Sequence, residues 1–244
     1  MTVRKSIVVP CYNEALNLPS LISRFAELYR PGDNWELVLV NNGSTDDSAS
    51  ALDREIKGKP YIVVATVPAP NVGYGHGILT GLRAARGEYL AWTHADGQTP
   101  PKDVLTAFDI LESAKNPRRT FVKGRRRGRP AGDRLFTFGM ETAAAIILGK
   151  RLPDINAQPK AFHRDLLGLA VFPPTDLSLD LYFFWLAKSN GFKVQTFDVS
   201  FGKREHGTSK WAFSLRSRKR HITRTLKFMV ALRSRTGPRS SLCA

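Results

Sequence analysis

The chain has 244 residues, enough to bury the core of one α/β domain, and 42% of them are hydrophobic and 24% charged. This composition excludes wholesale disorder. The formal net charge of +16 is concentrated in two segments: residues 115–134 hold nine Lys or Arg and one acidic residue, and residues 203–239 hold twelve and one. We therefore expect anionic partners at these two segments rather than a protein that is basic all over.

The cysteines and the apolar runs limit the cellular context. Cys11 and Cys243 are the only cysteines, so we expect no disulfide framework. The apolar run that follows Lys5 is only about four residues long, which predicts no signal peptide. No stretch approaches the roughly 20 apolar residues that span a bilayer. These features predict a cytoplasmic protein.

The first half of the chain alternates short apolar runs with segments of helical spacing. The apolar runs predict strands at residues 6–10, 35–40, 61–67 and 89–93. The spacing of apolar residues predicts helices at 13–29, 48–56 and 78–85. This alternation, with short polar or glycine-rich loops, predicts a parallel, doubly wound sheet over about the first 115 residues.

The second half is less regular. Residues 118–134 are expected to form a basic loop, and residues 192–201 a closing strand. Apolar spacing predicts helices at 136–148, 177–188 and 211–233. The last of these is basic, and it carries an apolar face made of Ile222, Leu226, Met229 and Val230.

Polar loops follow three of the predicted strands, at residues 11–14, 41–46 and 93–98. In open α/β sheets, ligands bind at the carboxyl ends of the strands, where loops and side chains converge. One such loop would mean little, because turns are rich in Asn, Gly and Asp in any case. Three at successive strand ends predict a shared ligand site.

Four segments together resemble a known family. They are V-P-C-Y-N-E at 9–14, V-N-N-G-S-T-D at 40–46, the glycine-rich segment 71–81 and H-A-D-G-Q-T-P-P at 94–101. They look like the family 2 glycosyltransferases of GT-A fold, and most of all like the dolichyl- and polyprenyl-phosphate sugar synthases. Later segments are similar to that subgroup as well: K-G-R-R at 123–126, residues 154–164, and R-E-H-G-T-S-K at 204–210.

The resemblance spans about residues 5–211 and implies a fold, a domain plan and an activity. The implied fold is α/β of GT-A type, with a Rossmann-like, mostly parallel central sheet flanked by helices. Residues 1–210 would form the catalytic domain, with a nucleotide-sugar-binding half at 1–115 and an acceptor-side half at 116–210. Residues 211–244 would form a basic C-terminal amphipathic helix and tail. The implied activity is inverting, metal-dependent transfer of a hexose from GDP-mannose or a UDP-sugar to polyprenyl or dolichyl phosphate.

The expected metal site centres on Asp96 and Gln98. They supply a carboxylate and an amide oxygen two residues apart in an extended segment, which places both on one side of the backbone. Mn²⁺ or Mg²⁺ prefers such oxygen ligands and can neutralise the charge of a departing diphosphate. The usual family motif is Asp-X-Asp followed by Gln, and here His94 stands in place of the first Asp. His94 either ligates the metal or packs beside it.

The resemblance also implies a donor site at the ends of the first two strands. It places the nucleotide base and ribose near Pro10, Tyr12, Glu14 and Asn41. Asn41 replaces the first Asp of the usual Asp-Asp-Gly-Ser. Because an amide both donates and accepts hydrogen bonds, this change leaves the choice of nucleotide open.

Glycines contribute to the expected donor site as well. Gly73 and Gly75 are expected to let the backbone approach the nucleotide-sugar, and Ala95 and Asp96 to line the same site. The glycines do not form a dinucleotide fingerprint, which would need a third glycine where Ile78 stands.

Basic residues are expected to bind the phosphates of donor and acceptor. The resemblance assigns this role to Arg126, Arg134, Arg204 and Lys210, and the planar fork of Arg binds phosphate bidentately. A phosphate acceptor is already anionic and needs little help from a general base. Arg126 is therefore expected to be catalytic together with Asp96.

Asp180 is the remaining catalytic candidate. It lies near where related enzymes carry an acidic residue, and it would be a base for a hydroxyl acceptor. The alternative is an ordinary Asp at a helix N-terminus.

The basic C-terminal helix has two interpretations. It fits an amphipathic helix lying on an anionic membrane surface, with the catalytic domain peripheral on the cytosolic face. Alternatively, its apolar face packs on the catalytic domain and its basic side is solvated.

Two other functions compete with polyprenyl-phosphate glycosylation. A nucleic-acid-binding protein would explain the two basic segments, but few aromatic residues interleave with the basic ones, so we expect no nucleic-acid partner. A degenerate transferase that binds the donor without turnover would explain His94 and Asn41. A glycosyltransferase with a hydroxyl acceptor is a further alternative within the family.

Overall fold

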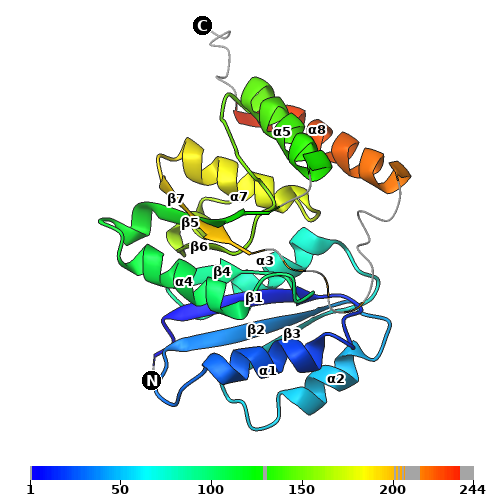
Figure 1. The fold of residues 1–244 in the computed structure, drawn as a ribbon, viewed down its shortest axis with the longest axis vertical. Coiled ribbons are helices and arrows are strands. Elements are labelled where there is room, and N and C mark those ends of the chain that lie inside the picture. Colours follow the sequence, from blue (N-terminus) through cyan, green and yellow to red (C-terminus); the bar gives the residue numbers. More distant parts are fainter. Residues whose placement is uncertain are drawn as a thin grey trace, which may run out of the picture.

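The apolar runs of the first half form the centre of a sheet. The computed structural model describes residues 2–128, 131–200, 202, 204, 206 and 215–236, without the side chains at 131, 133–136 and 215–218. Within these residues, seven strands form one sheet in the order β3-β2-β1-β4-β6-β5-β7 (Figure 1). The strands are β1 Lys5–Cys11, β2 Trp35–Asn42, β3 Ile62–Val67, β4 Tyr89–Trp92, β5 Thr120–Arg126, β6 Lys160–His163 and β7 Lys193–Val199.

Helices cover both faces of this sheet. They are α1 Leu18–Leu28, α2 Ser48–Glu55, α3 Tyr74–Ala84, α4 Pro101–Glu112, α5 Ala131–Leu148, α6 Asp165–Gly168, α7 Ser178–Ser189 and α8 Leu215–Thr236, with a short 3₁₀ helix at Pro117–Arg119. Successive residues of a strand point to opposite faces, so Ile7 and Val9 join the core under α1, α2 and α4, while Val8 joins the core under α3 and α7. The helices α5 and α8 lie beyond α7, at one end of the molecule (Figure 1). The predicted α/β sheet flanked by helices is confirmed.

The pairing of the strands defines where a ligand can bind. Strand β1 pairs in parallel with β2 on one side and β4 on the other, and β2 pairs in parallel with β3. Strand β6 is antiparallel to both β4 and β5, and β7 is parallel to β5. The chain moves outward from β1 to β3 and then returns to the other side of β1 with β4. The carboxyl ends of β1 and β4 therefore form the switch point where doubly wound sheets bind ligands.

The prediction of a basic loop at 118–134 is wrong over most of its length. Residues 120–126 form β5, and α5 begins at Ala131. Phe121, Val122 and Lys123 are buried in β5, and the structure pairs the charges of this strand with partners from distant segments. Sequence spacing alone gives no sign of those partners.

Other boundaries differ for local reasons. Helix α4 was not predicted; it begins with Pro101, whose fixed φ and missing N–H suit the first turn of a helix. Strand β6 was not predicted either, because its four residues include Lys160 and His163. Helix α3 begins at Tyr74 rather than at Ile78, inside the glycine-rich segment.

The apolar face predicted for the C-terminal helix is partly wrong. Met229 and Leu232 are buried, and Leu226 and Phe228 pack against the same core cluster. Val230, which was predicted on that face, is exposed. No helix among the described residues is long and apolar enough to cross a bilayer.

Candidate functional site

The loops after β1 and β2 are held together by side-chain hydrogen bonds. Asn13, with a positive φ of 55°, accepts a hydrogen bond from Thr45 N on Oδ1 at 2.8 Å, and its own N–H donates to Ser44 Oγ at 3.1 Å. Glu14 N donates to Ser48 Oγ at 2.9 Å, which fixes the start of the segment that leads to α1. These bonds join two of the three polar loops that the sequence predicts to share a site.

Asn41 closes its own loop. Its side-chain Oδ1 accepts a hydrogen bond from Ser44 N at 3.2 Å, and the residue is buried at the end of β2. An ionised Asp would accept the same bond, so the replacement by Asn preserves the turn while removing a negative charge.

Arg204 connects the ends of β1 and β4. Its Nη2 donates to Asp96 Oδ2 at 2.9 Å, and its Nη1 lies 3.6 Å from Glu14 Oε1. Asp96 also accepts a hydrogen bond on Oδ1 from Gln98 N, at 3.2 Å. Thus the structure brings together four predicted residues from three separate segments: Glu14, Asp96, Gln98 and Arg204.

The chain after β7 is fixed to this edge by further bonds. Gly202 N donates to Gln98 O at 2.9 Å, and Gln98 Nε2 donates to Gly202 O at 3.0 Å. Asn17 Nδ2 donates to Glu14 Oε2 at 2.5 Å and to His206 O at 3.3 Å. The described residues 202, 204 and 206 therefore lie against the ends of β1 and β4.

The residues around Asp96 fit a cation, but with few protein ligands. The buried Asp96 carboxylate already has a guanidinium against it, so its position favours positive charge. Among the described residues, no three His, Cys, Asp or Glu side chains form a group that could hold a metal ion. Mg²⁺ in phosphate-transfer sites is often held by one or two carboxylates together with substrate phosphates and water. Asp96 fits that kind of site, which the donor diphosphate would complete.

His94 lies beside the same carboxylate and next to Tyr74, with the two ring centroids 5.6 Å apart. Burial lowers the pKa of His94, and the charges of Asp96 and Asp180 offset only part of this shift. The imidazole is therefore neutral at pH 7, the form that can ligate a metal.

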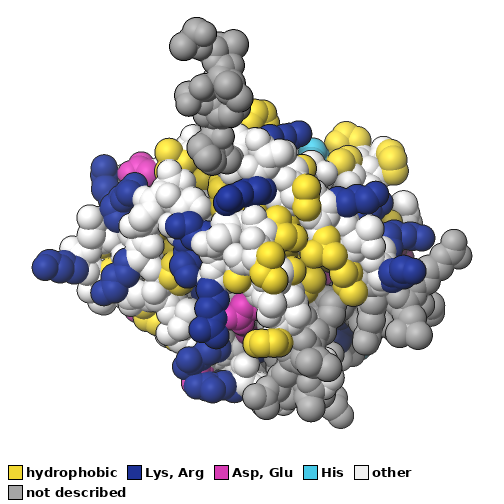
Figure 2. All heavy atoms as spheres, turned by 90° about the horizontal axis from the view of Figure 1, so that it is seen from above, with side chains coloured by type: hydrophobic (Ala, Val, Ile, Leu, Met, Phe, Trp, Pro, Cys, Tyr) yellow, Lys and Arg dark blue, Asp and Glu magenta, His cyan; other side chains and the backbone are white. Residues whose placement is uncertain are grey.

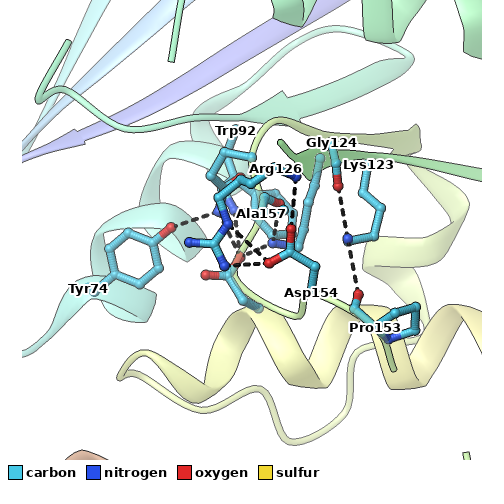
Figure 3. A network of polar contacts seen from close by, with 11 residues as sticks. Tyr74, Trp92, Lys123, Gly124, Arg126, Pro153, Asp154 and Ala157 are labelled. Carbon is cyan, nitrogen blue, oxygen red and sulfur yellow. Dashed lines mark hydrogen bonds and ion pairs between the residues drawn. The ribbon is translucent and has the colours of Figure 1, made fainter. Parts of the chain in front are cut away.

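Arg126 is held by Asp154 at the end of β5. The Arg126 guanidinium pairs with Asp154 Oδ1 through Nε, at 3.0 Å, and through Nη2, and Arg126 N donates to Asp154 Oδ2 at 2.9 Å (Figure 3). Burial alone would raise the pKa of the Asp154 carboxyl, but Arg126 outweighs it and holds that pKa below its usual value. The predicted phosphate-binding residue is thus fixed in orientation by a carboxylate that was not predicted as a site residue.

Asp180 is the centre of a buried polar network. Its Oδ1 accepts hydrogen bonds from Lys160 Nζ at 2.5 Å, Gln158 Nε2 at 2.9 Å and Trp92 Nε1 at 3.2 Å. Gln158 Nε2 also donates to Tyr74 Oη at 3.2 Å. Asp180 lies in the first turn of α7, as expected for an Asp at a helix N-terminus. Unlike an ordinary residue at such a position, however, it is only 1% exposed and is paired with Lys160.

Lys123 is a second buried lysine beside this network. Its Nζ donates to Gly124 O at 2.9 Å and to Pro153 O at 3.3 Å (Figure 3). Burial lowers its pKa to about 7, and the nearby charge of Lys160 adds to that effect. Lys123, Lys160 and Gln158 were not predicted as site residues. A lysine flanked by apolar residues, as in K-A-F at 160–162, was the available signal.

The glycines of the α3 segment have a role within the fold. A Cβ on Gly73 would lie 2.4 Å from Thr175 O, and one on Gly75 would lie 2.6 Å from Pro174 O. His76 N donates to Thr175 O at 2.9 Å. These glycines let the start of α3 approach the loop before α7, a reason that is independent of any donor.

The remaining predicted residues divide into two groups. Pro10 lies in β1 opposite Val40, Tyr12 follows that strand, and Ala95 is buried beside Asp96. Lys210 and the side chain of Arg134 lie outside the described part of the chain.

The chain matches a known protein family over a region that includes the polar loops after β1, β2 and β4. The model described as Glycosyl transferase family 2 matches residues 6–167, about two thirds of the chain. The chain belongs to glycosyl transferase family 2. The family match covers β1 through β6 and therefore includes Asp96, Arg126 and Lys160.

Curated relatives of this family 2 chain share a named activity. It is 29% identical over 213 residues to the undecaprenyl-phosphate 4-deoxy-4-formamido-L-arabinose transferase of Pectobacterium carotovorum subsp. carotovorum, covering 85% of this chain and 62% of the relative. It is 28% identical over 217 residues to the enzyme of the same name from Pseudomonas fluorescens, covering 85% and 60%. The chain thus spans less than two thirds of the length of these relatives.

Solved structures show the same fold. The chain is similar, with a TM-score of 0.72 and 18% identity, to glucosyl-3-phosphoglycerate synthase from Mycobacterium tuberculosis in complex with Mn²⁺, UDP-glucose and phosphoglyceric acid. The match covers 94% of this chain and 80% of that protein. The predicted GT-A fold, with its C-terminal helix, is confirmed.

Proposed function

We propose that this family 2 chain is the catalytic part of an inverting, metal-dependent glycosyltransferase that moves a hexose from a nucleotide-sugar to a polyprenyl phosphate. The observation that carries the proposal is the cluster of Asp96, Arg204 and Glu14 at the switch point of the sheet. The curated relatives are named for transfer to undecaprenyl phosphate, which supports an acceptor of this class. The donor is GDP-mannose or a UDP-sugar.

The donor would lie along the ends of β1, β2 and β4. Pro10, Tyr12 and Asn41 are suited to its nucleoside, and Asp96 would hold a Mn²⁺ or Mg²⁺ ion, with Gln98 or His94 beside it. When bound, the metal would neutralise the charge that develops on the departing diphosphate. Arg204 would move from Asp96 to the diphosphate, because guanidinium binds phosphate at least as well as carboxylate.

The acceptor would approach from the side of Arg126. A phosphate monoester carries its own negative charge, so its oxygen can attack the anomeric carbon in line without a general base. Arg126, oriented by Asp154, would align that phosphate. Attack opposite the leaving group inverts the anomeric centre.

The network around Asp180 supports a phosphate rather than a hydroxyl acceptor. A general base must be able to reach a substrate and take up a proton. The Asp180 carboxylate is almost fully buried and is already paired with Lys160. We infer that Asp180 is a positioning residue, which holds Lys160 and Gln158 rather than touching the acceptor.

An assay with a panel of nucleotide-sugars, undecaprenyl phosphate in detergent and Mn²⁺ or Mg²⁺ tests the proposal. We expect metal-dependent transfer to the lipid phosphate with one donor of the panel. Asp96→Ala should lower kcat roughly a thousandfold, because a catalytic metal contributes several kcal/mol. Asp53→Ala, at an exposed position of α2, is the matched control and should leave transfer unchanged. Full activity of Asp96→Ala would refute the metal assignment, and the absence of transfer with every donor would refute the reaction.

The lipid acceptor implies the location of the enzyme. A polyprenyl phosphate is anchored in a bilayer, so the catalytic part would work in the cytoplasm, peripheral on the cytosolic face of an anionic membrane. No nucleic-acid partner is needed to explain the basic segments under this proposal.

A further inference from the structure

The apolar face of α8 packs on the protein. Met229 and Leu232 are buried, and Leu226 and Phe228 contact the core cluster that also contains residues of α5 and α7. An amphipathic helix that lies on a membrane must turn its apolar side to the lipid. That side of α8 is already occupied, so most of the apolar contact with a bilayer must come from other elements.

Helix α5 supplies an apolar surface that faces solvent. Its inner side packs on the core through Met140, Ala144, Ile147 and Leu148. Its outer side carries an uncharged stripe of exposed residues at helical spacing: Phe138, Gly139, Thr142, Ala145 and Ile146. Phe138 is 62% exposed and Ile146 is 78% exposed. Between residues 135 and 149 the only charged residue is Glu141, which pairs with Arg151 at 2.6 Å.

Further exposed apolar residues and a groove lie beside α8, which packs against α5. Val171 and Phe172 project from the loop before α7, and Val230 projects from α8. A groove of about 450 Å³ lies between residues 172–176 and α8, where Phe228 and Arg235 line it. The Arg235 guanidinium lies 5.2 Å from the centroid of the Phe172 ring. Figure 2 looks down on this end of the molecule and shows hydrophobic side chains together, with Lys and Arg side chains on either side.

All the charged residues of α8 are basic. Residues 215–236 contain eight Lys or Arg and no acidic residue. Six of these basic side chains are described as exposed: Lys219, Arg220, Arg224, Lys227, Arg233 and Arg235. An isolated apolar patch would suit a second protein, but an apolar stripe beside a row of cations is the pattern of a surface that binds anionic lipid.

We propose that the α5–α8 face, defined as the outer stripe of α5, residues 171–172 and the exposed side of α8, docks on an anionic phospholipid bilayer. The α5 stripe and Phe172 enter the interfacial region, while the cations of α8 contact the headgroups. This inference rests on the proposed function only for its biological purpose, since lipid binding needs neither donor nor acceptor. Of the two interpretations of the C-terminal helix, the packing of α8 agrees with the one in which its apolar face lies on the catalytic domain, and the proposal assigns the apolar contact with lipid mainly to α5.

The docking face is connected to the candidate site through one loop. Thr175, at the edge of the groove, accepts the hydrogen bond from His76 N and packs against Gly73. Tyr74, the next residue, lies beside His94. A lipid phosphate held at the groove would therefore lie one loop away from the residues that surround Asp96.

Vesicle flotation of the purified chain, without metal, donor or acceptor, tests the proposal. We expect binding to phosphatidylcholine vesicles that contain roughly 30% phosphatidylglycerol, and little binding to pure phosphatidylcholine. The double variant Phe138→Ser, Ile146→Ser should lower the partition coefficient by on the order of tenfold or more, because it removes two inserted side chains. Lys219→Gln with Arg220→Gln should lower it by roughly fivefold per residue and weaken its salt dependence.

Matched controls lie at the opposite end of the molecule. Leu16→Ser removes another exposed apolar side chain, and Arg54→Gln removes an exposed cation of α2. Neither should change binding, and circular dichroism should show that all variants are folded. Equal binding to neutral and anionic vesicles, or equal binding of the Phe138→Ser, Ile146→Ser variant and the wild type, would overturn the proposal. The proposal would also be overturned if the wild type self-associates but does not bind vesicles, and if the Phe138→Ser, Ile146→Ser variant no longer self-associates. That result would indicate an interface between two copies of the chain. Transfer to acceptor in detergent would persist in either case, so this failure is distinct from failure of the proposed reaction.

Discussion

Arg204 and a divalent metal cannot both hold the same oxygen of Asp96. In the structure, Arg204 Nη2 lies 2.9 Å from Asp96 Oδ2, and Nη1 lies 3.6 Å from Glu14 Oε1. A metal that binds Asp96 through this oxygen must displace the guanidinium. Replacing Arg204 with Gln should therefore strengthen metal binding to the protein without donor.

The geometry gives the size of the effect. The Asp96 side chain is nearly buried, while that of Arg204 is 24% exposed, so solvent screens the pair only in part. A hydrogen bond to a charged group in such a setting contributes about 1.5–3 kcal/mol. Removing the competing cation should therefore lower the Kd for Mn²⁺ by about tenfold to a hundredfold. The affinity for the nucleoside diphosphate should fall in the same variant, because under the proposed function Arg204 would bind the diphosphate.

Titration calorimetry with Mn²⁺ alone and then with UDP or GDP would measure both effects. Arg118→Gln is the matched control, because it removes an exposed arginine whose nearest carboxylate, on Asp165, is 4.0 Å away. Adding Asp96→Asn to the Arg204→Gln variant should cancel the gain in Mn²⁺ affinity. Equal Mn²⁺ affinity in wild type and Arg204→Gln would refute the reasoning, as would an equal gain in Arg118→Gln.

Two further predictions concern the buried charges. The pKa of Lys123 in the folded protein is about 7, below the usual 10.5. Between these two pH values the lysine is protonated in the unfolded chain but largely neutral in the folded protein. The free energy of unfolding of the wild type therefore rises with pH in this range. The stability of Lys123→Met relative to wild type should therefore fall by about 2 kcal/mol between pH 7 and pH 9 in urea unfolding, whereas exposed Lys57→Met should show no such trend. Asp180→Asn leaves Lys160 buried without its anionic partner and should cost about 3–5 kcal/mol of unfolding free energy. Adding Lys160→Met should recover part of that loss, and wild-type stability of Asp180→Asn would contradict the role given to the pair.

The first half of the fold could be predicted because local signals there agree with tertiary structure. Strands β1 and β2 are buried along almost their whole length, and each contains an unbroken apolar run, residues 7–11 and 37–40, that is followed by a polar loop. That pattern also identified Asp96 and Glu14 as members of one edge. The pairing of β1 with both β2 and β4 then brings these two residues to one cation.

The second half could not be predicted in the same way, because charged residues are buried there, and a charged segment has the composition expected of a solvent-exposed loop. Lys123 and Lys160 are buried in strands, and Pro153 O and the Asp180 carboxylate, which satisfy them, lie 30 and 20 positions away along the chain. A reading of apolar periodicity treats such lysines as exposed. The same reasoning explains Asp180, whose partner Lys160 lies 20 positions earlier in the chain.

Arg126 and Arg204, the two of the three expected phosphate-binding arginines whose side chains the structure describes, differ in how available their charge is. The Arg126 guanidinium donates two hydrogen bonds to Asp154 Oδ1, its backbone N–H donates to Oδ2, and both side chains are largely buried. Such a pair is close to neutral, so it can align a phosphate but contributes little net attraction to it. Arg204 contacts its two carboxylates more loosely and belongs to a segment outside the sheet. Displacement from Asp96 would release its charge at the moment a metal arrives with the diphosphate. Under the proposed function, Arg204 would hold the donor and Arg126 would mainly orient the acceptor. Substitution of Arg204 should therefore weaken donor binding, and substitution of Arg126 should lower kcat.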